Sequence, residues 1–192
     1  LGDVYKRQDK MNFKHYMLKE IYDQPETAKN WLKNYLIKNS ENGQYQINYS
    51  FDTKFFESIE RIEIIACGTS KHAAMVGKFL LEQFSGIPTN VFYASEFRYS
   101  PPPLLPNTLT IGVTQSGETA DTIAAIDMEI KRRSSKEDKK FTPNLIAITN
   151  RKESSIGRQV VNIIDICAGI EVGVAATKTF FGQLLSFYGL AI

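Results

Sequence analysis

Two short stretches of the sequence gather hydroxyl side chains, each directly after an apolar run. Cys67-Gly68-Thr69-Ser70 follows the run 62–66, and Thr114-Gln115-Ser116-Gly117-Glu118-Thr119 follows the run 109–113. Both precede segments with helical periodicity, so hydroxyls and free backbone N–H groups would surround a helix N-terminus, which favours an anion. Ser and Thr are also common as plain helix caps. Two such turns after two strands of one sheet nevertheless favour a phosphate site.

The second stretch has the spacing of a nucleotide-binding P-loop but the wrong charge. Gly112-x-x-x-x-Gly117 is followed by Glu118, where a P-loop has the Lys that reaches the β- and γ-phosphates. A carboxylate at that position would repel a triphosphate. The chain also lacks the G-x-G-x-x-G pattern of dinucleotide sites. The loop therefore predicts the binding of one phosphate monoester, and we predict no cofactor.

Two further segments carry residues that could bind or pair. Glu171 to Lys178 has small residues that would let backbone approach a ligand, and Lys178 would either balance phosphate charge or simply be solvated. In Ala94-Ser95-Glu96-Phe97-Arg98-Tyr99, the charged side chains Glu96 and Arg98 would either pair with each other or face a partner subunit. We favour a structural role for that segment.

The elements that must position these residues alternate between strand and helix from about residue 55 onward. Apolar runs predict strands at 62–66, 90–93, 109–113, 145–149 and 161–167, with helices at 70–84, 117–132 and from about 175. The stripe of the first helix is Ala73, Val76, Leu80 and Phe84. This alternation predicts an α/β fold, a parallel sheet covered on both faces, with ligands at the carboxyl ends of its strands. The turns after Ala66, Val113 and Cys167 are the places to search.

The first 53 residues have a different character. Residues 11–40 predict helix with a break at Pro25, where a helix from Thr27 or Asn30 carries Trp31, Leu32 and Tyr35 on one face. Residues 40–53 are polar and predict a linker. We therefore expect a leader at 1–10, a helical segment and linker at 11–53, and the α/β domain at 54–192. The apolar C-terminal run also leads us to expect a longer protein.

Composition excludes several classes of function. The chain has two cysteines and two histidines, which exclude a disulfide framework and disfavour a Cys-built zinc site or a His-rich metal site, so no metal is predicted. Its net charge of +2 gives no bias towards nucleic acid or a membrane. The basic stretch 131–140 has no interleaved aromatic residues, so we interpret it as a solvated loop. Without a secretory segment, a cytoplasmic location is expected.

Taken together, the motifs resemble the sugar isomerase (SIS) domain, and most closely that of the isomerising glutamine–fructose-6-phosphate aminotransferases, or glucosamine-6-phosphate synthases. The resemblance covers the chain from about His15 to its end. It is carried by residues 15–25 (HYMLKEIYDQP), 67–70, 94–99, 115–122 and 171–179, all in order and in register.

The resemblance implies a three-layer αβα, flavodoxin-like domain that binds fructose 6-phosphate or glucosamine 6-phosphate. The implied phosphate ligands are Thr69, Ser70, Thr114, Gln115, Ser116 and Thr119. Val174 and Ala175 would contact the sugar, and Cys67, Gly68, Gly117 and Glu118 would shape the loops. The family has Ser more often than Thr at position 114, and often Ser at Ala176, where we assign no hydrogen bond.

In that family, the isomerase region converts fructose 6-phosphate to glucosamine 6-phosphate with ammonia from glutamine. A glutaminase domain and a second SIS domain supply the remaining groups, and the family forms homodimers or larger assemblies. We therefore expect this chain to bind sugar phosphate without turnover of its own, and assign it no catalytic residue. Glu118 is the only acid in the phosphate loop, and we expect it to have a structural role.

Three functional alternatives remain at this point. The chain could be a sugar-phosphate sensor module of a transcriptional regulator, or belong to another SIS sugar isomerase. A flavodoxin-like redox protein or nucleotide binder is disfavoured by Glu118 and by the missing glycine pattern.

Overall fold

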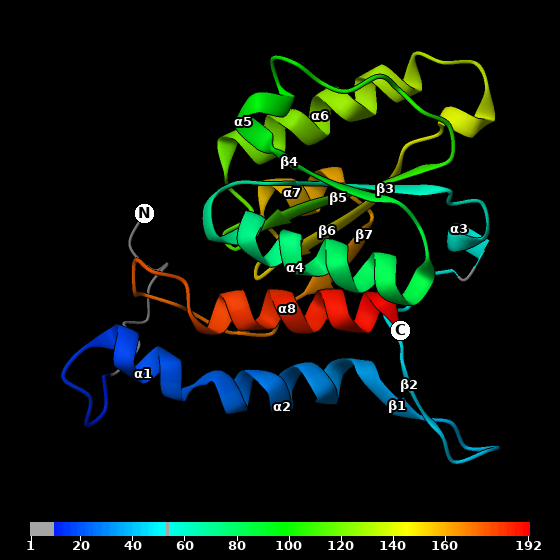
Figure 1. Ribbon diagram of the computed structural model, residues 1–192. Helices are drawn as coiled ribbons and strands as arrows, with labels where there is room; N and C mark the ends of the chain where they lie inside the picture. The colour runs from blue at the N-terminus through cyan, green and yellow to red at the C-terminus, as the bar shows by residue number, and fades with distance from the viewer. Residues whose placement is uncertain (1–9, 53) are drawn as a thin grey trace.

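A five-stranded, fully parallel sheet forms the centre of the computed structural model, which describes residues 10–52 and 54–192 (Figure 1). Its order is β4-β3-β5-β6-β7, which counts as 2-1-3-4-5 along the chain, the flavodoxin-like order. The predicted α/β class and parallel sheet are thereby confirmed. The strands are β3 (Arg61–Ala66), β4 (Thr89–Tyr93), β5 (Thr108–Thr114), β6 (Asn144–Thr149) and β7 (Asn162–Asp165).

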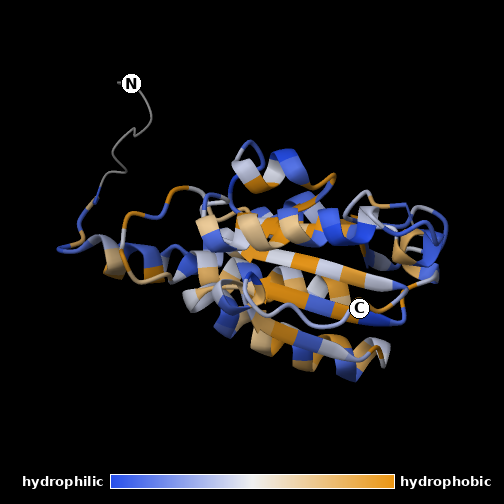
Figure 2. Ribbon diagram, turned by 90° about the horizontal axis from the view of Figure 1, so that it is seen from above, coloured by the Kyte–Doolittle hydropathy of each residue, from blue (hydrophilic) through white to orange (hydrophobic). Residues whose placement is uncertain are grey.

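The strands are apolar because the sheet is covered on both faces. β5 is buried at every position, and the central strands are largely hydrophobic along their length (Figure 2). On one face lie α4 (Gly68–Ser85) and α8 (Lys178–Ala191), and on the other lie α5 (Ala94–Phe97), α6 (Ala120–Ser134) and α7 (Ser155–Gln159) (Figure 1). These layers enclose two hydrophobic clusters, one on each side of the sheet.

The face of α4 that packs inward differs from the predicted stripe. Ala73 is buried as predicted, but Val76 and Phe84 are exposed. The buried residues are Ala73, Ala74, Gly77 and Leu81, and a Cβ on Gly77 would overlap the ring of Phe187 in α8. α4 and α8 therefore approach each other through small side chains, which a search for large apolar residues does not detect.

The N-terminal segment adds a further layer outside α8. α2 (Gln24–Tyr35) runs beside α8, on its side away from the sheet, and α1 (Tyr16–Tyr22) lies beyond the start of α8, by the loop that precedes it (Figure 1). The predicted break near Pro25 is confirmed: α1 ends at Tyr22 and α2 begins at Gln24, so Pro25 lies in the first turn of α2. The predicted linker 40–53 holds part of a hairpin formed by β1 (Leu36–Lys38) and β2 (Tyr45–Ile47), and the short helix α3 (Lys54–Glu57) follows. Residues 1–9 of the predicted leader lie outside the described residues.

The basic stretch 131–140 is only partly the solvated loop that was predicted. α6 continues to Ser134, and Arg133 is 1% exposed, with its Nε 2.7 Å from the Glu129 Oε1. The 3₁₀ turn Lys139–Phe141 closes this connection. The prediction fails for Arg133 because a buried carboxylate on the same helix face holds its guanidinium inside.

Candidate functional site

A cleft of about 340 Å³ opens at the carboxyl edge of the sheet. The register places Ala66 beside Val113, Thr114 beside Thr149, and Thr149 beside Asp165, so the loops after four strands start next to one another. Strand order reverses between β3 and β5, which is where ligands bind in such sheets. The cleft is lined by Gln115, Ser116, Asn150, Arg151, Gly169, Ile170 and Glu171.

The loop between β5 and α6 is ordered by its own hydroxyls. The Thr114 and Thr119 Oγ1 atoms lie 2.7 Å apart, and the Thr114 Oγ1 also accepts the backbone N–H of Gly117 at 3.3 Å. The Ser116 Oγ accepts the backbone N–H of Glu118 at 3.1 Å. Thr114 is 1% exposed, so its hydroxyl is buried against that of Thr119. Gln115 and Ser116 face the cleft directly.

Gly117 and Glu118 fasten this loop to α7. Gly117 has a φ of +70°, and its carbonyl accepts the backbone N–H of Ile156 at 3.2 Å. The Glu118 Oε1 accepts the backbone N–H of Ser155 at 2.8 Å. Hydrogen bonds from Ser155 lower the pKa of Glu118, with the positive charge of Arg158 contributing. The Glu118 carboxylate therefore bonds the N-terminus of α7 rather than that of its own helix.

The loop between β3 and α4 lies at the next strand end. Gly68 opens α4 with a φ of +53°, which favours glycine. Thr69 is exposed, whereas the Ser70 Oγ accepts a hydrogen bond of 2.9 Å from the Gln183 Nε2 of α8. Cys67 is half-buried in extended backbone before the helix. Thr69 and Ser70 belong to the same edge as the cleft but not to its lining.

The long loop between β7 and α8, residues 166–177, borders the cleft on its other side. Its Val174 and Ala175, predicted to touch the sugar, are exposed. The side chain of Asn150 holds the start of the loop, since its Nδ2 donates to the Gly169 carbonyl at 2.5 Å and its Oδ1 accepts the Ala168 N–H at 3.1 Å.

Two carboxylates hold the rest of this loop. The Glu20 Oε1 accepts the backbone N–H of Val172 at 2.5 Å, and the Glu20 Oε2 accepts that of Gly173 at 3.0 Å. The Glu171 Oε1 accepts the backbone N–H and the hydroxyl of Thr177 at 2.8 and 3.1 Å. Glu171 also bonds the hydroxyl of Thr179.

Lys178 neither balances a ligand in the cleft nor is solvated, so both predictions for it are wrong. It is 2% exposed, and its Nζ lies 3.2 Å from the Asp23 Oδ2. The Lys19 Nζ, 2.7 Å from the same oxygen, is buried as well. Burial opposes ionisation of Asp23, but the hydrogen bonds from both lysines outweigh it and lower the pKa of this carboxyl. Asp23 is therefore the shared counter-ion of two buried lysines.

The segment 94–99 forms α5 and its C-terminal turn. Arg98 does not pair with Glu96, as one prediction had it, because its Nη1 lies 2.6 Å from the Asp121 Oδ1 at the start of α6. Whether the segment also faces a partner subunit stays a prediction. The pair ties α5 to α6, the helix that follows the loop 114–119.

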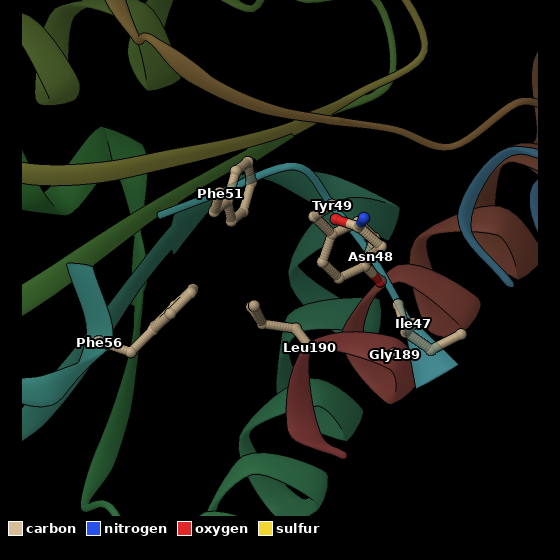
Figure 3. A pocket seen from close by; sticks show the side chains of 7 residues that line it. All are labelled: Ile47, Asn48, Tyr49, Phe51, Phe56, Gly189 and Leu190. Carbon is tan, nitrogen blue, oxygen red and sulfur yellow. The ribbon is translucent and has the colours of Figure 1, made fainter. Parts of the chain in front are cut away.

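Other hollows lie away from these loops. One of about 220 Å³ is lined by residues that precede β3 and by the end of α8, among them Tyr49, Phe51, Phe56 and Leu190 (Figure 3). It has few groups that could bind a charged ligand. Within residues 10–52 and 54–192, no three His, Cys, Asp or Glu side chains gather as metal ligands. No helix in this part of the chain is both long and apolar enough to cross a membrane.

Three residues of the site were not predicted from the sequence. Asn150 and Arg151 follow β6, whose carboxyl end was predicted to lie at this edge, so the turn after Thr149 was a signal that could have been used. Glu20 lies far away in the sequence, and no local pattern connects it to the loop at 172–173.

The chain is similar to proteins that contain a SIS domain. The family model described as SIS domain matches residues 55–192. Glutamine–fructose-6-phosphate aminotransferase (isomerizing) of Thermosynechococcus vestitus is 56% identical over 96% of this chain and 30% of the relative. The protein of the same name from Synechocystis is 52% identical, again over 96% of this chain and 30% of the relative. The C-terminal domain of glucosamine-fructose-6-phosphate aminotransferase from Francisella tularensis has a TM-score of 0.83 at 33% identity, covering 96% of this chain and 48% of that chain. The chain thus spans about 30% of the length of these curated relatives.

Proposed function

Because the chain belongs to the SIS domain family, we propose that its cleft binds fructose 6-phosphate as the first half of the isomerase region of a glutamine–fructose-6-phosphate aminotransferase. The observation that carries this proposal is the loop 114–119, whose hydroxyls and N–H groups stand at the point where strand order reverses. Such a loop binds a phosphate monoester without needing a Lys.

Each predicted ligand has a place in this proposal. Gln115 and Ser116 contact the phosphate from the cleft wall, and Thr119 presents its hydroxyl beside them. Thr69 and Ser70 approach from the neighbouring strand end, and Thr114 acts through the Thr119 hydroxyl. Arg151, which lines the cleft beside Ser116, supplies the positive charge that Lys178 does not. Val174 and Ala175 lie against the sugar.

The proposed whole enzyme takes ammonia from glutamine and makes glucosamine 6-phosphate. Its glutaminase and second SIS domains would belong to the remaining 70% of the relatives' length, and assembly as a homodimer or larger oligomer in the cytoplasm is part of the proposal. Glu118 is not the base of the isomerisation, since its carboxylate is bonded to α7. We assign the proton transfers to groups outside these 192 residues.

A sensor module or another SIS isomerase is less well supported. The relatives above match residues of the N-terminal segment as well as the SIS domain, over 96% of the chain, and both are named aminotransferases. The segment packs on α8 as part of one fold, rather than forming a separate DNA-binding unit. These observations favour the aminotransferase.

A thermal-shift titration tests the proposal. The ligands are fructose 6-phosphate, glucosamine 6-phosphate, inorganic phosphate, ATP and NADH. Saturation at a hundred times Kd adds about 2.7 kcal/mol to the free energy of unfolding. We expect a shift with the sugar phosphates, a smaller one with phosphate and none with the nucleotides. A shift with ATP or NADH alone would overturn the proposal.

A further inference from the structure

α1 is inverted with respect to an ordinary surface helix. Its apolar Met17, Leu18 and Ile21 are 47, 44 and 40% exposed, whereas Lys19 and Glu20 are 4 and 0% exposed. A surface helix usually buries its apolar stripe and exposes its charges. Burial of apolar side chains therefore does not hold α1 in place, and its inward face consists of the charged residues Lys19 and Glu20.

Glu20 uses this position to bond backbone rather than another side chain. Its two oxygens accept the N–H groups of Val172 and Gly173, and a Cβ on Gly173 would lie 2.5 Å from the Glu20 Oε2. A fully buried carboxylate is costly unless hydrogen bonds satisfy it. The two N–H groups supply those bonds, and the glycine leaves room for the carboxylate.

The loop that Glu20 bonds has no helix or strand of its own between β7 and α8. Asn150 holds it at residues 168–169, and Glu171 ties it to Thr177 at its far end. Between these two ties, the bonds to Glu20 come directly before Val174 and Ala175. Among the described residues, Glu20 provides the only side-chain hydrogen bonds to residues 172–175. Without Glu20, this part of the cleft border would lose those bonds.

We propose that Glu20 is a positioning residue, which fixes the loop 171–175 against the cleft and thereby makes the site select a sugar phosphate over inorganic phosphate. The part of this inference that concerns selectivity rests on the proposed function. The phosphate loop is held by α7 instead, so phosphate affinity is independent of Glu20.

The test compares Glu20→Leu and Glu20→Gln in the 192-residue chain. The Gln side chain keeps one acceptor oxygen, so it should rescue part of the effect. Trp31→Phe serves as a structural control, because Trp31 packs on the other half of α8 and donates to the Ser186 Oγ at 3.3 Å, away from the loop. Two readouts are used: hydrogen exchange at the amides of Val172 and Gly173, and the Kd values for fructose 6-phosphate and inorganic phosphate.

We expect Glu20→Leu to remove exchange protection at both amides and to weaken fructose 6-phosphate binding about tenfold, because the loop must then be ordered when the ligand binds. Phosphate affinity should stay within about twofold, and Trp31→Phe should change stability but not the ratio of the two Kd values. A folded Glu20→Leu chain with unchanged protection at both amides would overturn the inference. If the unaltered chain binds no sugar phosphate, the proposed function fails, while the exchange readout still decides the role of Glu20.

Discussion

A Cβ added to Gly117 would overlap the Ser154 side chain, so the loop 114–119 and the turn before α7 touch with no space for a methyl group. The same glycine has a φ of +70°, which side chains rarely adopt. Two separate physical reasons therefore exclude other residues from the centre of the proposed phosphate site.

Gly117→Ala should destabilise the chain by about 2–4 kcal/mol, because strain at positive φ and overlap with Ser154 add. Gly86→Ala is the matched control, since Gly86 also has a φ of +70° but would have no atom within 4 Å of its Cβ. The free energy of unfolding of Gly86→Ala, measured with urea, should fall by only about 1 kcal/mol. Equal losses in the two variants would contradict the overlap with Ser154.

Ser116→Ala combined with Thr119→Ala should weaken fructose 6-phosphate binding far more than it destabilises the fold. Local hydroxyl bonds contribute about 1 kcal/mol each, whereas bonds to a phosphate contribute about 1.5–3 kcal/mol each. Isothermal titration and urea unfolding measure the two effects. Ser135→Ala is the control, because the Ser135 Oγ bonds the Arg132 carbonyl at the far end of α6. Unchanged affinity in the double variant would refute the assignment of both hydroxyls.

Arg151→Gln should weaken fructose 6-phosphate binding about tenfold and reduce the dependence of affinity on salt, because a charge-assisted contact to phosphate is lost. Lys152→Gln removes the same charge one residue away, where the Nζ lies 3.8 Å from the Asp165 Oδ2 and lines no part of the cleft. That variant should bind within about twofold of the unaltered chain. Equal effects of the two changes would show that Arg151 acts only through net charge.

Asp23→Asn should destabilise the chain by about 2–3 kcal/mol at pH 7, because Lys19 and Lys178 stay buried without their counter-ion. The pKa of Asp23 is lowered in the folded state, so its stabilisation is present above the ordinary pKa of 3.8 and is lost as pH falls through the folded-state value. Urea unfolding should show that the difference in free energy of unfolding between Asp23→Asn and the unaltered chain shrinks below pH 3.8.

The exposed Glu26 provides the control for that measurement. Glu26→Gln removes an ion pair of 3.7 Å with Lys29, whose side chain is exposed as well. The resulting loss in free energy of unfolding should stay below about 0.5 kcal/mol, both at pH 7 and below pH 3.8. A similar loss in both variants would mean that the buried lysines do not depend on Asp23.

Glu63→Gln should gain stability relative to the unaltered chain as pH rises. Burial and the nearby Glu129 raise the pKa of Glu63, against the positive charge of Arg133. Above pH 4.5 the unfolded chain releases this proton while the folded chain keeps it, so folding is penalised until the folded-state pKa is passed. Urea unfolding between pH 4.5 and 8 measures the difference, with the exposed Glu137→Gln as control. A difference that shrinks with rising pH would contradict this sign.

The sheet and its loops could be predicted because their signals are local. Each strand is a short apolar run, and the residues after β3 and β5 are polar and small, as a turn at a covered sheet requires. The two hydroxyl-rich turns follow directly from that placement. Their roles as ligands stay predictions until binding is measured.

The ionic interior could not be predicted in the same way. Lys178 and Asp23 are 155 residues apart in sequence, so no periodicity connects them. Arg133 was interpreted as solvated because its neighbours are basic, although Glu129 one turn earlier was available to pair with it. In each case a carboxylate partner decides whether the charged side chain is buried: Asp23 is far away in sequence from Lys178, whereas Glu129 is one helical turn from Arg133.

The position of α2 against α8 has a consequence for the order of folding during synthesis. Trp31 and Ser186, which form a hydrogen bond, are separated by 155 residues. At about 5–20 residues per second, roughly 8–30 s pass before the ribosome delivers α8 after α2. Trp31 and Tyr35 have no buried site during that time. α2 is thus synthesised well before α8, the helix against which its aromatic side chains are buried.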